Sequence, residues 1–506
     1  MRNVAVRLLV ASALSSAVPA HADTLRDALF KAYQTNPTLT GARAGQRAVD
    51  ENVPIARSQG LPQISANGGY TENALKSGNS LLNPQREASA NTQLVVPIYR
   101  AGAVRGSVRA AQTRVDAGQA SLRGTEADLF TNVVAAYEDV IRDEAIVGLN
   151  QQNVRVLEVN LRASRDRFQV GDLTRTDVAQ SEARLSIARS QLQTAQAQLI
   201  SSRENYIRVV GDAPGVLDEP PPLPNLPATA DAAVTTALSD NPTLLAANRS
   251  RDATRYDIDV ARAGRLPQVS AVVGGNYFNY LGSFGSGTNV RPGQGQSGTS
   301  GTVGLQLNVP IFQGGRPAAQ VRQAEARRSQ AIEAVTETER GVVAQARSAF
   351  AVYRSSQEVI ASSEQAVGAN KLSLEGVRAE NSVGTRTILD ILNAEQELLN
   401  SQVTLVSARR DAYVAGFSLL AAMGRAEARD LGLEGGPLYD PAVNYNRVRN
   451  RIGDFGGDGE PAPVATRTTG TRAQDATVTK PLDPLLDTPV DRNRPLTTGS
   501  QSPDRK

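Results

Sequence analysis

The chain has 506 residues, more than one hydrophobic core usually organises, so we expect several domains or an extended structure. It has no Cys and a single His, His21, which excludes disulfides, thiol nucleophiles, Cys–His zinc sites and His-based acid–base catalysis. Its 54 basic and 51 acidic residues nearly balance, so the charge does not indicate a nucleic-acid surface.

Residues 1–22 have the three parts of a secretory signal peptide. Arg2 and Arg7 give a positive start, residues 8–18 are apolar, and residues 20–22 form a small-residue cleavage site. We therefore expect export to the periplasm or outer membrane of a two-membrane bacterium, without an N-terminal lipid anchor. No later stretch reaches the roughly 18 apolar residues of a membrane-spanning helix, so we expect that any crossing uses strands.

Short helices and two strands are predicted next. Helices follow Thr24, and Asn36-Pro37 acts as a cap and first-turn proline that restarts the helix. Strands are predicted over about Gln63–Glu72 and Ala88–Tyr99. The second strand alternates apolar with small polar residues, which suits an outer-membrane strand. A half-buried strand in a soluble sheet has the same pattern, and both interpretations stay open at this point.

A very long helix is predicted from about Gly102 to Gln169. At 1.5 Å per residue it would be roughly 100 Å long. Apolar residues recur every seven positions, the pattern jumps by four after Leu129, and it resumes at Val133. A return helix is predicted after Val170-Gly171.

The chain contains the same arrangement twice. Asn36-Pro37-Thr38-Leu39 recurs 205 residues later as Asn241-Pro242-Thr243-Leu244, and Val170-Gly171 recurs 213 residues later as Val383-Gly384. In the second copy, the strand pattern places Val303, Leu305, Leu307, Val309 and Ile311 on one face. Such self-similarity indicates an internal duplication.

The remaining segments differ in composition. A Pro-rich stretch between the copies predicts a stiff extended connector, and Gly, Pro, Thr and charged residues at the C-terminus predict disorder. The expected domains are a signal peptide (1–22), a first repeat (23–211), the connector (212–230), a second repeat (231–424), an equatorial C-terminal segment (425–452) and a disordered tail (453–506).

Four strands per chain cannot close a barrel by themselves. An open sheet edge cannot lie in lipid, because its backbone groups would lack hydrogen-bond partners, and the smallest membrane barrels have about eight strands. We therefore expect copies of the chain to associate. Three copies would supply twelve strands, continued by the long helices into one tube.

The residues from Ser382 to Ala394, SVGTRTILDILNA, closely resemble a motif of the TolC-type outer-membrane channels, the outer membrane efflux protein family. The resemblance covers about Thr24 to Leu433. It implies a mainly α protein with a β membrane part: a homotrimer with a 12-stranded β-barrel continued by a 12-helix α-barrel, spanning outer-membrane lipid and periplasm. It also implies docking to a periplasmic adaptor and an inner-membrane transporter for multidrug efflux or type I secretion, without a cofactor.

The resemblance also implies roles for residues near the helical turns. Val170, Gly171, Val383, Gly384 and Thr387 would lie at the tips that the adaptor contacts, although Gly171 and Gly384 also suit ordinary helix C-caps. Links through Thr176, Asp177, Asn381 and Arg386 would hold the tip closed. Arg386 and Asp390, four residues apart, would otherwise be a solvated pair on one helical face.

The resemblance places Asp390 and Asn393 at the pore constriction. Asn393 stands where a second acidic residue is common, and Asn381 stands where a gating Tyr is common. The ring would then carry three carboxylates, and fewer links would hold the closed state. We expect Asp390, repeated three times around the axis, to attract cations.

Two other classes of function remain to be weighed. A periplasmic adaptor or coiled-coil scaffold would also have a signal peptide and long hairpins, but it would not need duplicated strand pairs with apolar faces. A secreted enzyme that uses carboxylates could draw on Glu182 and Glu395, which occupy matching repeat positions. Paired acids on coiled-coil helices are more often solvated or ion-paired, and the sequence has no nucleophile elbow, phosphate loop or metal-ligand cluster.

Overall fold

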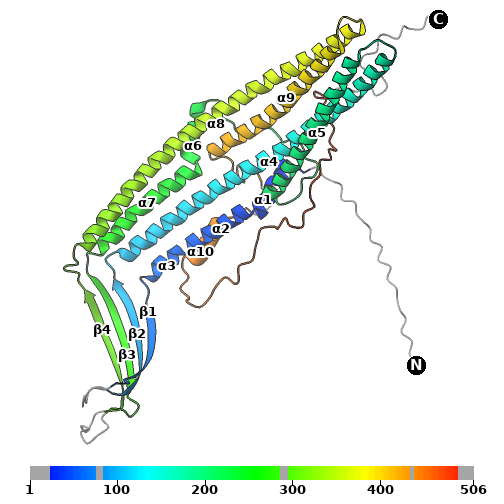
Figure 1. Cartoon of the computed structure of the whole chain (residues 1–506). Helices are drawn as coiled ribbons and strands as arrows, with labels where there is room; N and C mark the ends of the chain where they lie inside the picture. The colour runs from blue at the N-terminus through cyan, green and yellow to red at the C-terminus, as the bar shows by residue number, and fades with distance from the viewer. Residues whose placement is uncertain (1–22, 76–83, 285–294, 434–437, 488–506) are drawn as a thin grey trace, which may run out of the picture.

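The computed structural model describes residues 23–75, 84–284, 295–433 and 438–487; the expected signal peptide lies outside them. The molecule is long and mainly helical, with one sheet at an end of the helical body (Figure 1). In the described residues no helix combines the length and apolar character needed to cross a membrane.

The two repeats have the same order of elements: short helices, two strands, a long helix and a return helix. The first repeat consists of α1 (Leu25–Thr35), α2 (Pro37–Asp50), α3 (Asn52–Ser58), β1 (Gln63–Glu72), β2 (Arg86–Tyr99), α4 (Ala103–Gln169) and α5 (Arg175–Val210). The second consists of α6 (Ala230–Asp240), α7 (Pro242–Ala263), β3 (Gln268–Asn279), β4 (Ser297–Asn308), α8 (Arg316–Ser382) and α9 (Ile388–Ala422), and α10 (Pro441–Val448) follows. The duplication is confirmed.

Each repeat restarts its short helix at an Asn-Pro pair, as the sequence predicts. The Asn36 side chain accepts a hydrogen bond from the Thr38 amide at 2.9 Å, and it donates one to the Val209 carbonyl at 2.8 Å. Asn241 accepts from the Thr243 amide at 3.0 Å and donates to the Ala422 carbonyl at 2.9 Å. Each asparagine therefore caps a helix and ties it to the end of the return helix of its own repeat.

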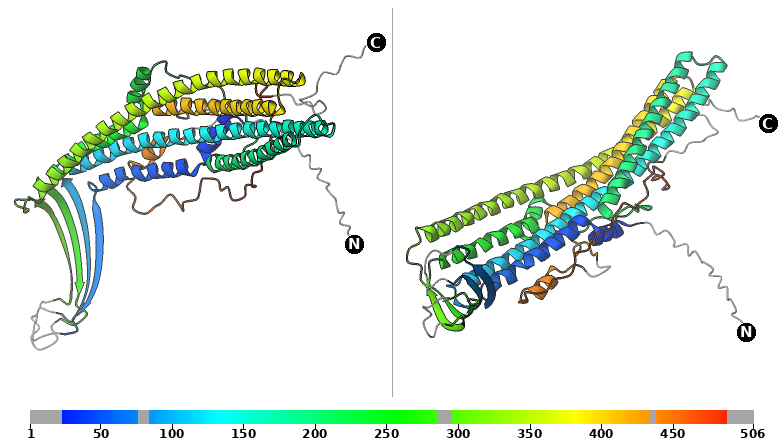
Figure 2. Two further views of the ribbon diagram at one scale, coloured as in Figure 1. Left: turned by 45° about the horizontal axis from the view of Figure 1, so that its top comes forward. Right: turned by 60° about the horizontal axis from the view of Figure 1, so that its bottom comes forward.

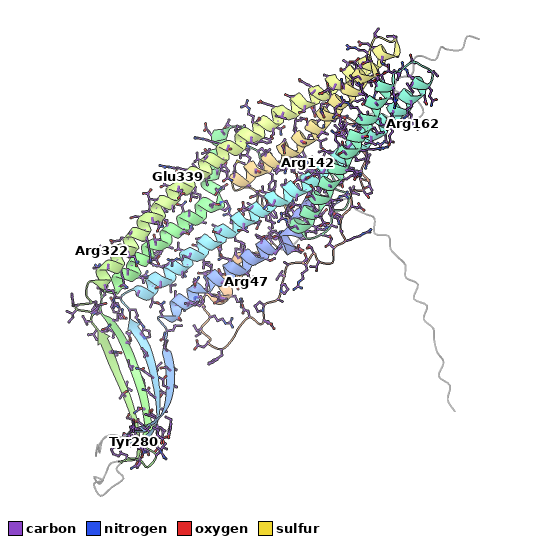
Figure 3. The ribbon with its side chains drawn as sticks, viewed as in Figure 1. Arg47, Arg142, Arg162, Tyr280, Arg322 and Glu339 are labelled. Carbon is purple, nitrogen blue, oxygen red and sulfur yellow. The ribbon has the colours of Figure 1, made fainter. Side chains whose placement is uncertain are left out.

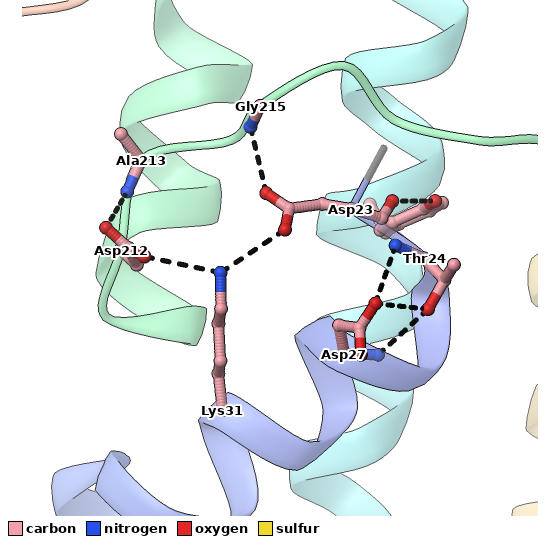
Figure 4. Close-up of polar contacts among 8 residues, drawn as sticks. Asp23, Thr24, Asp27, Lys31, Asp212, Ala213 and Gly215 are labelled. Carbon is pink, nitrogen blue, oxygen red and sulfur yellow. Dashed lines mark hydrogen bonds and ion pairs between the residues drawn. The ribbon is translucent and has the colours of Figure 1, made fainter. Parts of the chain in front are cut away.

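The start of the chain's described part holds the connector in place (Figure 4). Lys31 in α1 lies between two carboxylates, 3.4 Å from Asp23 and 3.3 Å from Asp212. Asp23 also accepts a hydrogen bond from the Gly215 amide at 3.1 Å and forms a β-bridge with Leu217. These contacts join the end of the first repeat to its own beginning.

The sheet is antiparallel throughout, in the order β1-β2-β3-β4, and it bends away from the helices (Figure 2). Residues directly opposite each other share a face, so the register gives an apolar row of Ile64, Leu94, Val273 and Val303. A row of Asn67, Asn91, Asn276 and Ser300 lies on the other face. Ile64 and Val303 are 79% and 85% exposed in the single chain, so the apolar face has no cover there.

One part of the strand prediction is wrong. β4 ends at Asn308, so Val309 and Ile311 lie beyond it. Pro310 follows directly, and proline has no N–H to donate to a strand ladder. The equivalent proline of the first repeat, Pro97, lies within β2. The pairing of β2 with β3 is irregular there, since the register shifts between Pro97 and Tyr99.

The long helices α4 and α8 have 67 residues each and pair with α5 and α9 to form two hairpins. The sevenfold apolar pattern with its four-residue jump marks the buried side: Val115, Leu129, Val133, Val140 and Val147 are all at most 5% exposed. Phe168, at the end of this series, is 45% exposed because the helix ends one residue later. One core cluster lies around Phe130, Tyr137 and Tyr206, and a second lies nearer the tips.

The prediction of a disordered tail over residues 453–506 is wrong for part of its length. Residues 473–487 have little regular structure, but they pack against the helices, and Leu486 is only 2% exposed. Low hydrophobicity favours disorder only when a segment has no surface to bind. Here a few leucines and aspartates meet a groove formed by residues far away in sequence. Residues 488–506 lie outside the described part of the chain.

Candidate functional site

The two hairpins end in turns with the same geometry. Gly171 and Gly384 both have φ of +82°, in the left-handed region that glycine adopts without strain. The Gly171 amide donates to the Phe168 carbonyl and the Asp172 amide to the Arg167 carbonyl. Gly384 and Thr385 make the equivalent bonds to Asn381 and Glu380, so both long helices end in a Schellman motif.

Both return helices begin with a capping box. The Asp177 carboxylate accepts from the backbone and hydroxyl of Thr174 at 2.9 and 2.7 Å, and the Asp390 carboxylate accepts from those of Thr387 at 2.9 and 2.8 Å. Hydrogen bonds from Thr174 and Thr387 hold the pKa of these carboxyls below its usual range. Because the pKa is lower in the folded protein, the charged caps stabilise the turns at pH values above the ordinary Asp pKa. This stabilisation is lost as the pH falls from the ordinary Asp pKa through the lowered one.

The alternative interpretation, in which Arg386 and Asp390 form a solvated pair on one helical face, is wrong. α9 begins at Ile388, so Arg386 lies in the turn, where its Nε is 2.7 Å from a carboxylate oxygen of Glu380. The Asn381 side-chain amide donates to the Arg386 carbonyl at 2.7 Å. Arg386 is therefore paired within its own turn, because the Thr387 cap sets the start of the helix. The side-chain oxygen Oδ1 of Asn381 is buried and has no hydrogen-bond partner in the described part of the chain.

The four residues expected as gating links do not contact one another across the hairpins of one chain. Thr176 is exposed, and Asp177 serves its own cap. In the described part of the chain, no hydrogen bond or ion pair joins Asp177 to Arg386. Within one chain Asp177, Asn381 and Arg386 therefore each make contacts inside their own turn.

A different residue pair joins the two hairpins. Arg184 of α5 donates from Nη2 to Oδ1 of Asn393 in α9 at 2.7 Å. Asn393 was expected at the constriction, but Arg184 was not identified from the sequence. The contact spans 209 positions, and no local motif around Arg184 indicates it.

A repeat-related Arg–Glu pair closes each hairpin farther from the turn. Arg165 lies 3.7 Å from Glu182, with both side chains more than half exposed. Arg378 contacts Glu395 at the equivalent place, where the Glu395 side chain is only 8% exposed and burial raises the pKa of its carboxyl. Glu182 and Glu395, the candidates for carboxylate catalysis, are thus held in interhelical ion pairs.

The tips expose apolar side chains to solvent. Val170 is 80% and Val383 is 74% exposed, at the ends of the two long helices. Figure 3 labels Arg162 close to the tip of α4, and Tyr280 at the opposite end of the molecule beyond the sheet. The candidate adaptor-contact residues therefore lie at the far end from the sheet.

A cavity of about 920 Å³ lies between the hairpins near Arg142, which Figure 3 shows partway along the helical body. Glu138 lines it, and one of its carboxylate oxygens, Oε1, has no hydrogen-bond partner in the part of the chain that the structure describes. Burial raises the Glu138 pKa to about 8, outweighing the attraction of Arg410. In the described residues no group of three or more His, Cys, Asp or Glu side chains could hold a metal ion.

Comparison with known proteins gives a consistent result. A family model described as "Outer membrane efflux protein" matches residues 28–212 and 233–425. The chain is 33% identical over 448 residues to the outer membrane efflux protein BepC of Brucella suis, with 88% of this chain and 95% of that protein covered. It is 27% identical to the outer membrane protein TolC of Escherichia coli, covering 88% of this chain and 93% of TolC.

Solved structures share the fold at lower identity. The CmeC outer membrane channel of Campylobacter jejuni superimposes with a TM-score of 0.68 at 16% identity, covering 84% of this chain and 89% of that one. The outer membrane protein VceC of Vibrio cholerae has a TM-score of 0.66 at 21% identity, covering 79% of this chain and 96% of that one. The expected fold class is therefore confirmed.

Proposed function

Because the chain belongs to the outer membrane efflux protein family, whose members are outer-membrane channels, we propose that three copies form a gated tunnel that exports drugs or proteins. The protein is located in the outer membrane and extends into the periplasm. The proposal of a trimeric tunnel rests on one observation. The described chain has a four-stranded sheet with two unpaired edges, and this sheet is joined to helices of 67 residues.

The sheet supports assembly with other copies. Among the described residues, β1 and β4 each have only one neighbouring strand. In lipid, an unpaired strand edge costs several kcal/mol for each backbone group without a partner. Pairing β4 of one copy with β1 of the next removes both edges, and three copies of four strands give a closed barrel of twelve. The apolar row through Val303 would then face lipid, and the row through Asn276 would face water.

The helices support a conduit through the periplasm. With 67 residues, α4 and α8 each extend roughly 100 Å from the end next to the sheet. The equal lengths bring both hairpin tips to similar distances from the membrane. Three copies with two hairpins each supply twelve helices for the wall of the tunnel.

The tips support docking and gating. The exposed Val170 and Val383, with Gly171, Gly384 and Thr387 beside them, would contact the hairpins of a periplasmic adaptor that connects to an inner-membrane transporter. Asp390 and Asn393 would surround the constriction. Thr176, Asp177, Asn381 and Arg386 would act in gating by keeping each turn rigid, while links between turns come from neighbouring copies.

The proposal is tested with the purified full-length protein. We expect trimers that resist dissociation in detergent at room temperature, and single-channel currents when these trimers are added to planar lipid bilayers. A monomer that stays in solution without detergent would contradict the proposal. Deleting the gene and comparing drug sensitivity with the set of exported proteins would identify the cargo.

A further inference from the structure

The end of the described chain runs along the groove between the two hairpins. We name residues 473–487 the tail strap. It begins on α5, where the Gln474 amide donates to Glu204 at 3.0 Å and Arg203 donates to the carbonyls of Asp475 and Thr477 at 2.7 and 2.9 Å. Arg203 is also paired with Glu144 of α4 at 2.6 Å, so the strap begins on a charged site of the first hairpin.

The middle of the strap crosses α4 next to the connector. Lys480 donates to the Leu217 carbonyl at 2.9 Å. Leu482 lies directly against Gly148 of α4, where a Cβ would come within 2.9 Å of a Leu482 methyl carbon. A larger residue at position 148 would therefore require the Leu482 side chain to shift. Leu482 thus packs closely against α4 at a position where glycine leaves room for its side chain.

The end of the strap is held by the second hairpin. Asp483 pairs with Arg409 of α9 at 2.7 Å, and Lys371 of α8 donates to the Leu485 carbonyl. The Gln402 side chain of α9, only 4% exposed, donates to the Leu486 carbonyl at 2.7 Å, and Leu486 joins the core cluster near the tips. Asp487 then returns to α4 by accepting from Gln152 at 3.0 Å.

We propose that the tail strap is an intramolecular latch that fastens the two hairpins together and has to leave its groove before they can move apart. It is bonded to both hairpins, so separating them breaks either its contacts with Arg203, Gly148 and Gln152 or those with Arg409, Lys371 and Gln402. Acidic side chains face the basic residues of the groove and leucines fill its apolar part. This inference rests on the proposed gated channel.

Engineered cysteines measure whether the strap is docked. The chain has no Cys, so the double variant Gly148→Cys with Leu482→Cys introduces the only thiols. Replacing Leu482 removes the methyl groups nearest to position 148, which leaves room for a disulfide. We expect nearly complete cross-linking in the full-length protein under mild oxidation. Absence of cross-linking would overturn the proposal.

Charge reversal then tests the latch. Asp483→Arg faces Arg409 with a like charge, and we expect lower cross-linking and a leak current in bilayers that rises about tenfold, the factor that losing one charge-assisted hydrogen bond corresponds to. In a variant that combines Asp483→Arg with the two cysteines, forming the disulfide should lower the leak current again. Reducing the disulfide should return the leak current to its raised value. Asp458→Arg is the matched control, since Asp458 lies in the same tail but outside the strap, where it pairs with Arg447 of α10.

The outcomes separate the latch from the proposed function. A strap that is displaced by Asp483→Arg without any change in leak would overturn the latch while leaving the channel intact. An unmodified protein that gives no current would instead contradict the channel, and the cross-linking yield would still report on the docked strap.

Discussion

At the scale of single residues, Glu138 is a carboxylate that the fold buries, and among the described residues it has no close ion pair. Its side chain belongs to α4 and lines the cavity between the hairpins, where the residue is 6% exposed. The burial favours the neutral acid and raises its pKa to about 8. Since the folded state binds this proton more tightly than the unfolded chain, stability is greatest below the ordinary Glu range and falls as the pH rises towards about 8.

Glu138→Gln should remove this pH dependence. The amide is neutral at every pH, so we expect the variant to unfold at a higher temperature than the unmodified protein at pH 8–9. The difference should shrink towards pH 5, by up to about 1.4 kcal/mol for each pH unit. Circular dichroism in detergent measures it. Glu144→Gln is the control: it loses the ion pair with Arg203 and should lower the unfolding temperature instead. The prediction would be contradicted if the unfolding temperatures of the unmodified protein and of Glu138→Gln changed in parallel with pH.

Asp390 combines a structural role with a proposed functional one. Its carboxylate caps α9 by accepting a hydrogen bond from the Thr387 amide. This hydrogen bond stabilises the turn whether or not Asp390 also lines a pore. The proposed ring adds a second effect, because three carboxylates around one axis attract cations. The two roles can be separated by removing the charge and the cap independently.

Asp390→Asn removes the charge and keeps an oxygen that can accept from the Thr387 amide. We expect the block of single-channel current by a multivalent cation to weaken about tenfold or more, since fixed charge would no longer concentrate the ion. Thr387→Ala, which removes the capping hydroxyl and keeps the carboxylate, should retain the block. Equal block in both variants and in the unmodified protein would place the constriction elsewhere.

At the scale of elements, the hairpins are two copies of one design that differ where they meet each other. Turns, caps and closing ion pairs repeat, but only the second hairpin buries its pair, Arg378 with Glu395. The hydrogen bond between Arg184 and Asn393 joins α5 to α9 and has no repeat-related equivalent. It is a direct polar link between the hairpins near the tips, and Arg410 of α9 with Asp139 of α4 forms another farther from the tips at 2.9 Å.

Arg184→Ala should loosen the tip. One exposed hydrogen bond of this kind contributes about 0.5–1 kcal/mol, and three copies together would raise the leak conductance about tenfold. Arg189→Ala is the matched control, because Arg189 is on the same helix and pairs with Glu158 of its own hairpin at 2.8 Å. Equal leak from the two variants would mean that the Arg184 link does not restrain the tip.

At the scale of the whole molecule, two faces of one sheet decide where the protein resides. The register places apolar residues in one row and small polar residues in the other across all four strands. Neither face is covered by the helices, because the sheet bends away from them (Figure 2). The alternation that remained ambiguous in the sequence thus belongs to a sheet without a soluble core on either side.

Val303→Arg puts a charge on the apolar face near the middle of β4. We expect a loss of about 2–4 kcal/mol in the membrane-inserted state and less detergent-resistant trimer. Thr302→Arg, one position along on the polar face, should leave trimer yield nearly unchanged and alter ion selectivity instead. Heating gels and bilayer currents measure both effects, and equal losses from the two substitutions would contradict the proposed orientation of the sheet.

The sequence alone determined the features that depend on neighbouring residues. The duplication follows from matching residues in the two halves of the sequence. The strand Gln63–Glu72, the Asn-Pro restarts and the glycine turns follow from local hydrogen bonding and backbone preference, and the structure reproduces them. The resemblance at residues 382–394 was sufficient to identify the family. The helical spacing wrongly placed Arg386 and Asp390 on one helical face, because the Thr387 cap sets the start of α9 two residues after Arg386.

Only the tertiary structure decided the contacts between distant segments. Four features need surfaces that exist only after the hairpins have packed. They are the link between Arg184 and Asn393, the burial of Glu395 but not of Glu182, the cavity at Glu138 and the docked tail strap. Residues 473–487 have a composition that favours disorder, and their order comes from Arg409, Gln402 and Lys371. Short-range interactions are encoded in adjacent residues, whereas these contacts depend on how whole helices approach each other.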